Sequence, residues 1–167
     1  DFKTAMQEWL PLAEAGDAEA QFRVGRLYDI GEGVSVGGAQ AVRWYEKAHK
    51  QGNLKATYNL ARMLDVGERI PRNYGRASTL YLFAACKGHL KSQFNLGLMY
   101  MGGHGFPRNY IRAFMWFYYA ERNGLSDAKT RYSLFDNFVS SQDKERAKEL
   151  LRSQKLCDSV GVGGKGL

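Results

Sequence analysis

The stretch with the clearest capacity for chemistry is "MGGHGFPRNY" at 101–110, which is rich in glycine and carries a basic residue, Arg108. The backbone N–H groups of such a loop can cradle a phosphate or another anion. A matching loop, "VGERIPRNY" at 66–74 with Arg72, stands thirty-six residues upstream, and "IGEGVSVGG" occupies 30–38. Recurrence at a fixed period indicates a repeated architecture rather than one active site. We therefore interpret the loop as a turn between helices, with phosphate binding as the alternative.

Other candidate catalytic groups are sparse. The three histidines, His49, His89 and His104, occupy different repeat positions and lack the spacing of metal ligands. The sequence contains no nucleophile elbow, no zinc-protease motif and no P-loop. We expect no catalytic residue, no metal and no cofactor.

Two cysteines, Cys86 and Cys157, are too few for a disulfide framework. Cys157 lies about two repeats beyond Cys86, and packed neighbouring helices are separated by about 8–10 Å. We therefore expect no bond between them, unless the C-terminal segment folds back.

From residue 2 to about residue 136 the chain follows a period of 36 residues without a gap. Apolar residues recur at three- and four-residue spacing over 17–28 and again over 39–50, which predicts two amphipathic helices in each unit. Glycines suit the ends of these helices, and small residues suit the place where two helices cross closely. Aligned columns include Gly16, Gly52, Gly88 and Gly124; Gly31, Gly67 and Gly103; Gly25, Ala61, Gly97 and Ser133; and Tyr45, Tyr81 and Phe117.

The segments 18–52, 54–88 and 90–124 carry a pattern that resembles the Sel1-like repeat, a relative of the tetratricopeptide repeat. The resemblance extends to 2–16, which is similar to the second helix of an earlier unit, and to 125–136, which is similar to the first helix of a later one. It implies an all-α, right-handed superhelical solenoid with full repeats at 17–52, 53–88 and 89–124. A capping helix is expected at 141–156 and a flexible tail at 157–167. One departure is Arg69, which stands in place of the second glycine of its loop.

The resemblance also implies where a partner would bind. In tetratricopeptide-like superhelices the first helix of each pair lines the concave side, and repeat proteins present that surface to other molecules. Side chains that vary between repeats at non-core positions of this helix are the expected contacts, although a plain solvated face is the alternative. They are Arg23, Arg26, Asn59, Arg62, Asn95 and Leu98.

A second candidate patch joins the loop residues Arg72 and Arg108 to the helix "AFMWFYYA" of the third unit. This helix is apolar most of the way round, so its outer face must also be buried. Either the C-terminal helix caps that face, as solenoid ends require, or a partner protein docks there. The residues concerned are Phe114, Met115, Tyr118 and Tyr119.

Charge is unevenly distributed along the chain, whose formal net charge is +7. Residues 1–38 hold 3 basic and 7 acidic side chains, whereas residues 39–124 hold 13 and 4, a net charge of +9. This predicts a protein partner with an acidic surface. The basic residues are scattered instead of aligned with stacking aromatics, so we do not expect a nucleic-acid partner. No apolar run is long enough to span a bilayer, and we expect a monomer.

The resemblance implies a non-enzymatic protein-interaction module, and a bacterial setting in the cell envelope or among secreted factors. We expect the periplasm or another part of the envelope; the chain begins at Asp1 without a visible leader, and the cytoplasm is the alternative. Some small members are immunity proteins that neutralise a secreted toxin or lipase. The alternative function is a β-lactam-binding or hydrolytic enzyme like that suggested for a cysteine-rich branch, whose paired cysteines this chain lacks.

Overall fold

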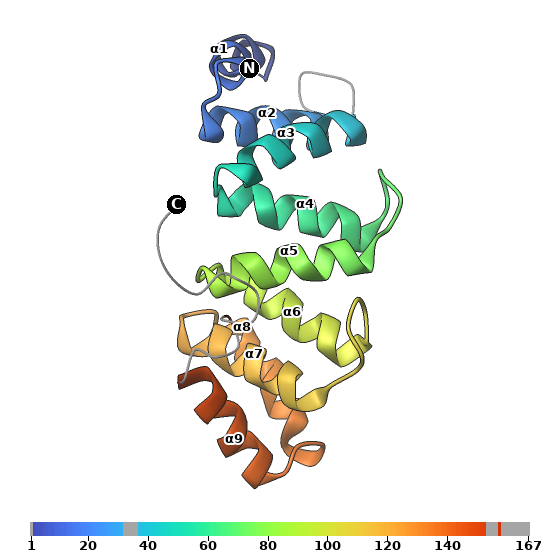
Figure 1. Cartoon of the computed structure of the whole chain (residues 1–167), viewed down its shortest axis with the longest axis vertical. Coiled ribbons are helices and arrows are strands. Elements are labelled where there is room, and N and C mark those ends of the chain that lie inside the picture. Colours follow the sequence, from blue (N-terminus) through green and yellow to red (C-terminus); the bar gives the residue numbers. More distant parts are fainter. Residues whose placement is uncertain (1, 32–36, 153–156, 158–167) are drawn as a thin grey trace. The chain divides into compact units, whose positions relative to one another are not determined.

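The computed structural model describes residues 2–31, 37–152 and 157, and in these ranges the chain is all-α. It divides into two compact units, a first unit, Asp1–Asn73, and a second unit, Tyr74–Leu167. The first unit contains α1–α4 and the second α5–α9 (Figure 1). The helices are α1 (Phe2–Glu14), α2 (Ala18–Ile30), α3 (Gly38–Lys50), α4 (Leu54–Val66), α5 (Tyr74–Cys86), α6 (Leu90–Gly102), α7 (Tyr110–Arg122), α8 (Asp127–Ser133) and α9 (Ser141–Arg152), with a 3-10 turn, η1 (Leu134–Asn137), after α8.

The first helix of each repeat ends at a glycine. Gly31, Gly67 and Gly103 have φ of 77°, 71° and 75°, in the left-handed region that favours glycine, and cap α2, α4 and α6. The loop of "MGGHGFPRNY" is thus a helix-to-helix turn, as expected. Asn109 caps the helix that follows, because its side chain accepts the Arg112 N–H at 2.9 Å. Pro107 lies in the turn, two residues before this cap.

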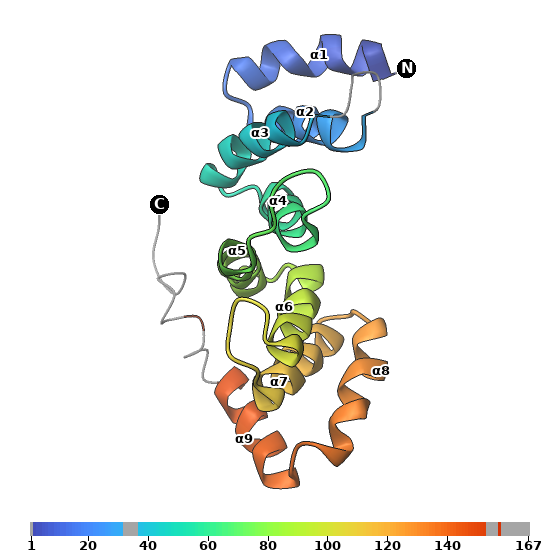
Figure 2. The same ribbon diagram turned by 90° about the vertical axis from the view of Figure 1, so that its right-hand side faces the viewer.

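The small-residue column is explained by aromatic rings of the second helices. A Cβ on Gly25 of α2 would lie 2.7 Å from the Tyr45 ring of α3, and a Cβ on Gly97 of α6 would lie 2.7 Å from the Phe117 ring of α7. Tyr45 and Phe117 are fully buried. Within each unit the two helices of a pair therefore pack backbone against ring, and α2 with α3 and α6 with α7 run side by side (Figure 2).

The C-terminal helix α9 packs against α7, which is the capping alternative of the two that the apolar helix left open. Phe114 and Met115 are buried, and Ala147 of α9 is inaccessible to solvent. Lys148 of α9 lies over the Tyr118 ring at 5.5 Å. The predicted capping helix 141–156 is observed over Ser141–Arg152, and 153–156 lie outside the described residues.

The expectation that Cys86 and Cys157 stay apart is wrong. They form a disulfide, with 5.7 Å between their Cα atoms. The expectation took the chain to continue along the repeat array, but α9 packs back on α7, and Cys157 lies at the end of α5. Cys157, predicted as the first residue of a flexible tail, is covalently fixed, while 158–167 lie outside the described residues. A stable disulfide is typical of an oxidising compartment.

Acidification should destabilise the second unit through His89, whose Nδ1 caps α6 by accepting the Ser92 N–H at 3.3 Å. Burial, and then the charge of Lys91, lower the pKa of His89 below its ordinary value of 6.5. Below about pH 6.5, the ordinary pKa of histidine, His89 therefore binds more protons in the unfolded chain than in the folded one. The free energy of unfolding should fall as the pH drops below this value, whereas His89 should not change it above this value.

Urea unfolding at about pH 7.5 and about pH 5.5 measures this loss, with His89→Asn as the control, because asparagine caps a helix without titrating in this range. The variant should lose less stability on acidification. Equal losses in both proteins would show that the His89 cap does not sense pH.

Candidate functional site

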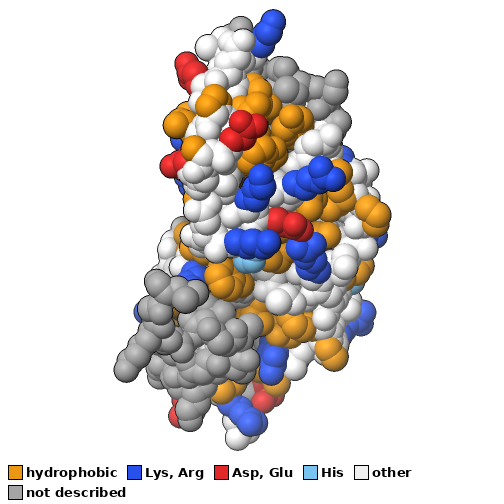
Figure 3. Space-filling view, turned by 45° about the horizontal axis from the view of Figure 1, so that its top comes forward, with side chains coloured by type: hydrophobic (Ala, Val, Ile, Leu, Met, Phe, Trp, Pro, Cys, Tyr) orange, Lys and Arg blue, Asp and Glu red, His pale blue; other side chains and the backbone are white. Residues whose placement is uncertain are grey.

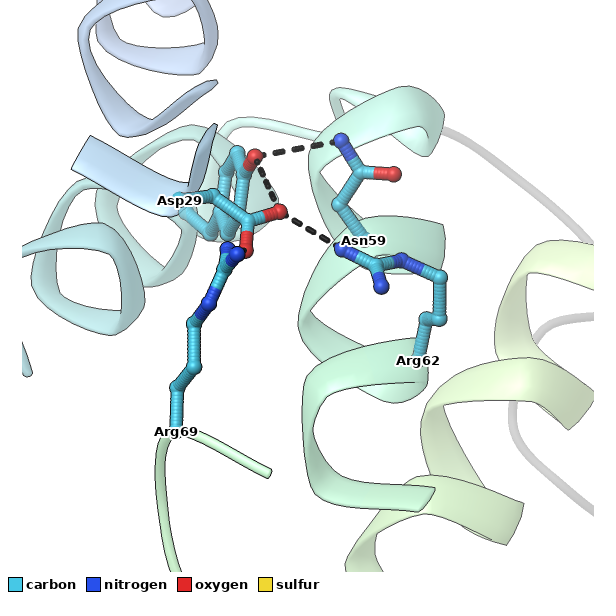
Figure 4. A network of polar contacts seen from close by, with 5 residues as sticks. Asp29, Asn59, Arg62 and Arg69 are labelled. Carbon is cyan, nitrogen blue, oxygen red and sulfur yellow. Dashed lines mark hydrogen bonds and ion pairs between the residues drawn. The ribbon is translucent and has the colours of Figure 1, made fainter. Parts of the chain in front are cut away.

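Charged side chains of both signs lie among hydrophobic ones on the face drawn in Figure 3, and basic side chains stand beside acidic ones. One such group in the first unit is partly buried. Asp29, in the last turn of α2, is the one buried charged residue in the described part of the chain, with 8% of its side chain exposed. Two guanidinium groups neutralise it. Arg62 Nη2 of α4 lies 2.6 Å from Asp29 Oδ2, and Arg69 Nη1, in the loop after α4, lies 3.0 Å from Oδ1 (Figure 4).

The buried Tyr45 of α3 completes the network. The Tyr45 hydroxyl donates to Asp29 Oδ2 at 3.4 Å and accepts from Asn59 Nδ2 at 3.2 Å. Burial, and then the negative charge of Asp29, raise the pKa of Tyr45 far above its ordinary value of 10.0. The phenol therefore stays protonated and acts as a donor to the carboxylate, not as a base or nucleophile.

Local structure brings these residues together from four elements: α2, α3, α4 and the loop between α4 and α5. The α4–α5 loop lies against the start of α3, since a Cβ on Gly38 would stand 2.5 Å from the Arg69 carbonyl oxygen. Arg72 holds the other end of the loop, because its Nε and Nη2 donate to the Val66 carbonyl at 3.2 and 2.8 Å. The loop is thus fixed at both ends, and its Arg69 side chain reaches the end of α2 in the preceding repeat.

An open pocket of about 160 Å³ lies over the network. We call it the arginine pocket; it is lined by Asp29, Ile30, Arg62, Met63, Val66, Glu68 and Arg69. The Arg62 and Arg69 side chains remain 41% and 39% exposed. The pocket therefore combines accessible guanidinium groups with an aliphatic wall.

The two predicted contacts on α2 are both exposed. Arg23 forms an ion pair with Glu19 at 3.0 Å and lies 4.5 Å from the centre of the Trp9 ring. Arg26 follows three residues later on the same helix, so the two side chains lie on one face of α2.

The two predicted asparagines have structural partners. Asn59 and Asn95 each donate to the hydroxyl of the tyrosine fourteen residues earlier, Tyr45 and Tyr81, at 3.2 and 2.9 Å. These bonds repeat with the period of the array and join the second helix of one repeat to the first helix of the next, so they belong to the architecture of the junction between repeats. Arg62 joins Asn59 in the first unit, whereas Asn95 and the half-buried Leu98 lie in the second.

The predicted second patch is divided by the structure. Arg72 and Arg108 are exposed loop residues, whereas Phe114 and Met115 are buried and Tyr118 and Tyr119 are half-buried. Arg72 uses its guanidinium to hold a helix end. In the loop of Arg108, a Cβ on Gly105 would meet the Tyr74 carbonyl and Ser78 of α5.

In the described ranges, no group of three or more metal-ligating side chains occurs. No helix there has the length and apolar character needed to cross a membrane.

Sequence reasoning missed Asp29 as a site residue and noted Arg69 only as a departure from the loop pattern. The two are forty positions apart and meet because neighbouring repeats stack. The indication in the sequence was weak: Arg62 and Arg69 stand 33 and 40 positions after Asp29, near the period of 36 but not in its register.

The repeat architecture matches a known family model. The Sel1 repeat matches at 18–53, 54–89 and 90–125, one residue beyond the repeat boundaries expected from the sequence. No curated protein matches the chain.

Similar solved structures come from bacteria. A protective antigen of uropathogenic Escherichia coli strains with an SLR fold is 29% identical, with a TM-score of 0.77 over 89% of this chain and 32% of that one. A Sel1 repeat protein from Oxalobacter formigenes is 24% identical, with a TM-score of 0.74 over 93% and 63%. Cysteine-rich protein B of Helicobacter pylori is 18% identical, with a TM-score of 0.60 over 77% and 92%.

The chain spans about a third of the length of the Escherichia coli protein. The family model covers more than half of the 167 residues, in three consecutive units that coincide with the helix pairs. The chain therefore belongs to the Sel1 repeat family.

Proposed function

We propose that this chain is a non-enzymatic protein-binding module whose docking surface includes the exposed side chains of α2 and α4 in the first unit. The observation that carries the proposal is the contrast between columns. Core columns repeat from unit to unit, while the polar positions of the first helices differ and include exposed arginines such as Arg23 and Arg26. Surface positions whose residues change from repeat to repeat are not needed for the fold, so they are available for recognition of a partner.

The chemistry of the arginine pocket supports binding over catalysis. Asp29 is neutralised by two guanidinium groups, and Tyr45 is held in its protonated form. Neither is an available base, and in the described residues no histidine or cysteine adjoins them among the contacts of the network. Exposed arginine is also enriched in protein interfaces.

The finer form of the proposal is a bacterial envelope protein that neutralises a secreted toxin or lipase, with the periplasm as its compartment. The Cys86–Cys157 disulfide supports an oxidising compartment. The similar structures from bacteria support the setting.

Affinity capture from an extract of the producing cells tests the role, with the full chain as bait and protein identification as the readout. Arg26→Glu is the test variant and Arg43→Glu the matched control. Both replace exposed helical arginines of the first unit, but Arg43 lies on α3. One protein should be retained in equal amount with the bait, and Arg26→Glu should reduce it several-fold because a like charge then faces an acidic partner.

Arg43→Glu should retain the same amount as the unmodified chain. Capture of a toxin or lipase would establish the finer role. Equal retention by Arg26→Glu would exclude α2 from the docking surface, and covalent labelling of the chain by a fluorescent penicillin would favour the enzymatic alternative.

A further inference from the structure

The chemistry of the arginine pocket indicates which group of a partner it receives. We propose that the pocket binds the carboxylate of an Asp or Glu side chain of the partner protein, flanked in the partner's sequence by an aliphatic residue. This inference rests on the proposed function, because the carboxylate belongs to the protein that docks on α2 and α4.

Charge inside the network favours an added anion. Asp29 carries one negative charge and is shared by Arg62 and Arg69, so these three residues retain a net charge of +1. Each guanidinium contacts Asp29 through one nitrogen, while a guanidinium carries five N–H donors. Both side chains are about two-fifths exposed. Planar guanidinium groups with open donors match the geometry of a carboxylate.

Glu68, at the edge of the same pocket, restricts the charge of the ligand. With Glu68 the four charged residues of the lining sum to zero. A singly charged carboxylate meets less repulsion from Glu68 than a doubly charged phosphate does. Because the lining as a whole has no net charge, the second charge of a phosphate gains no net attraction there, and the planar guanidinium groups match the flat carboxylate.

The size of the pocket points to one side chain of a larger partner. Its volume of about 160 Å³ is below the roughly 300–1,000 Å³ typical of small-molecule and cofactor sites. Ile30, 43% exposed, adds an exposed aliphatic side chain to the wall that Met63 and Val66 contribute. An aliphatic residue beside the carboxylate would cover this exposed surface.

The repeat register shows that this pocket is not part of the architecture. One repeat later, Leu98 and Gly105 occupy the positions of Arg62 and Arg69. This third repeat still folds into the same kind of helix pair, α6 and α7. The fold therefore does not require two arginines at these places.

Nuclear magnetic resonance of the full chain tests the proposal with a defined probe, the capped tripeptide acetyl-Leu-Glu-Leu-amide. Acetyl-Leu-Gln-Leu-amide is the neutral control. The acidic peptide should shift the Nε–Hε signals of Arg62 and Arg69 and the methyl signal of Met63 in a saturable way. The neutral peptide should bind about tenfold more weakly, because it lacks the charge-assisted hydrogen bonds.

Variants separate ligand binding from a merely structural role of the arginines. Arg69→Gln leaves Asp29 paired with Arg62 and should weaken the acidic peptide about tenfold. Glu68→Gln removes the repelling charge and should strengthen it several-fold, whereas Glu14→Gln, an exposed change on α1 of the same unit, should have no effect. If Arg69 only fixes the loop to α2, Glu68→Gln will leave peptide affinity unchanged.

The outcomes distinguish this proposal from the proposed function. Equal binding of the two peptides, shifts away from the pocket, or tighter binding of inorganic phosphate than of the acidic peptide would each overturn the carboxylate assignment. A partner retained in the capture experiment together with no peptide response would overturn the assignment alone. A peptide response with no captured partner would count against the protein-binding role while supporting the chemistry of the pocket.

Discussion

Replacing Cys86 and Cys157 together with serine should lower the free energy of unfolding of the second unit by about 2–5 kcal/mol. The disulfide joins residues 71 positions apart, so it removes a large amount of conformational freedom from the unfolded chain. It also ties Cys157, which follows α9 in the chain, to the end of α5, and Lys144 of α9 lies over the ring of the buried Phe114 of α7.

Thermal unfolding with and without a reducing agent measures this effect. The unmodified chain should lose stability on reduction and then unfold like the double variant, while the double variant should not respond to the reductant. A loss of this size corresponds to a midpoint shift of roughly 10 °C or more for a unit of this length. Two free thiols in the oxidised protein, or equal midpoints for all samples, would contradict the covalent link.

Gly97→Leu should destabilise the second unit by about 3 kcal/mol or more, because the site has no room for a side chain. A Cβ at this position would stand 2.7, 2.8 and 2.9 Å from three carbons of the Phe117 ring, which is fully buried. The ring cannot retreat without moving α7 from α6. Overpacking of this kind outweighs the gain of about 1 kcal/mol in helix propensity that comes from replacing a glycine inside a helix.

Urea unfolding of a double-mutant cycle with Phe117→Ala identifies the ring as the cause. The double variant should lose at least about 1 kcal/mol less than the sum of the single losses, because the alanine makes room for the leucine. Lys91→Leu, an exposed change on the same helix, is the control and should have little effect at a pH where His89 is neutral. Strict additivity would place the strain elsewhere.

Repetition made most of the fold predictable from the sequence. Each column samples the same structural environment several times, so the turn glycines, the crossing positions such as Gly25 and Gly97, and the aromatic core could be identified without coordinates. The helix ends differ by one or two residues from the prediction; for example, α2 continues to Ile30 because its cap is Gly31.

Features that occur once were not predictable in this way. The Cys86–Cys157 bond depends on the direction in which α9 returns, and no column contains that information. Asp29 and Arg69 meet through the stacking of two repeats, so neither residue reveals its partner from its own position.

At one column the predicted partner contacts also have a structural role. Asn59 and Asn95 were expected to contact a partner because they are polar and lie on first helices, yet each donates to a buried tyrosine hydroxyl. Each asparagine stands fourteen residues after its tyrosine, and both columns recur in successive repeats. This shared recurrence was the indication of a structural hydrogen bond. Arg62 differs from the leucine of the next repeat and lies at the edge of an accessible pocket.

Hydrogen–deuterium exchange of the full chain, with and without its captured partner, tests most directly that a protein docks on the first helices of the first unit. The account predicts slower exchange in α2, in α4 and in the loop 67–73 when the partner is bound, with the exposed face of α3 unchanged. Protection confined to α3 or to the second unit would contradict it.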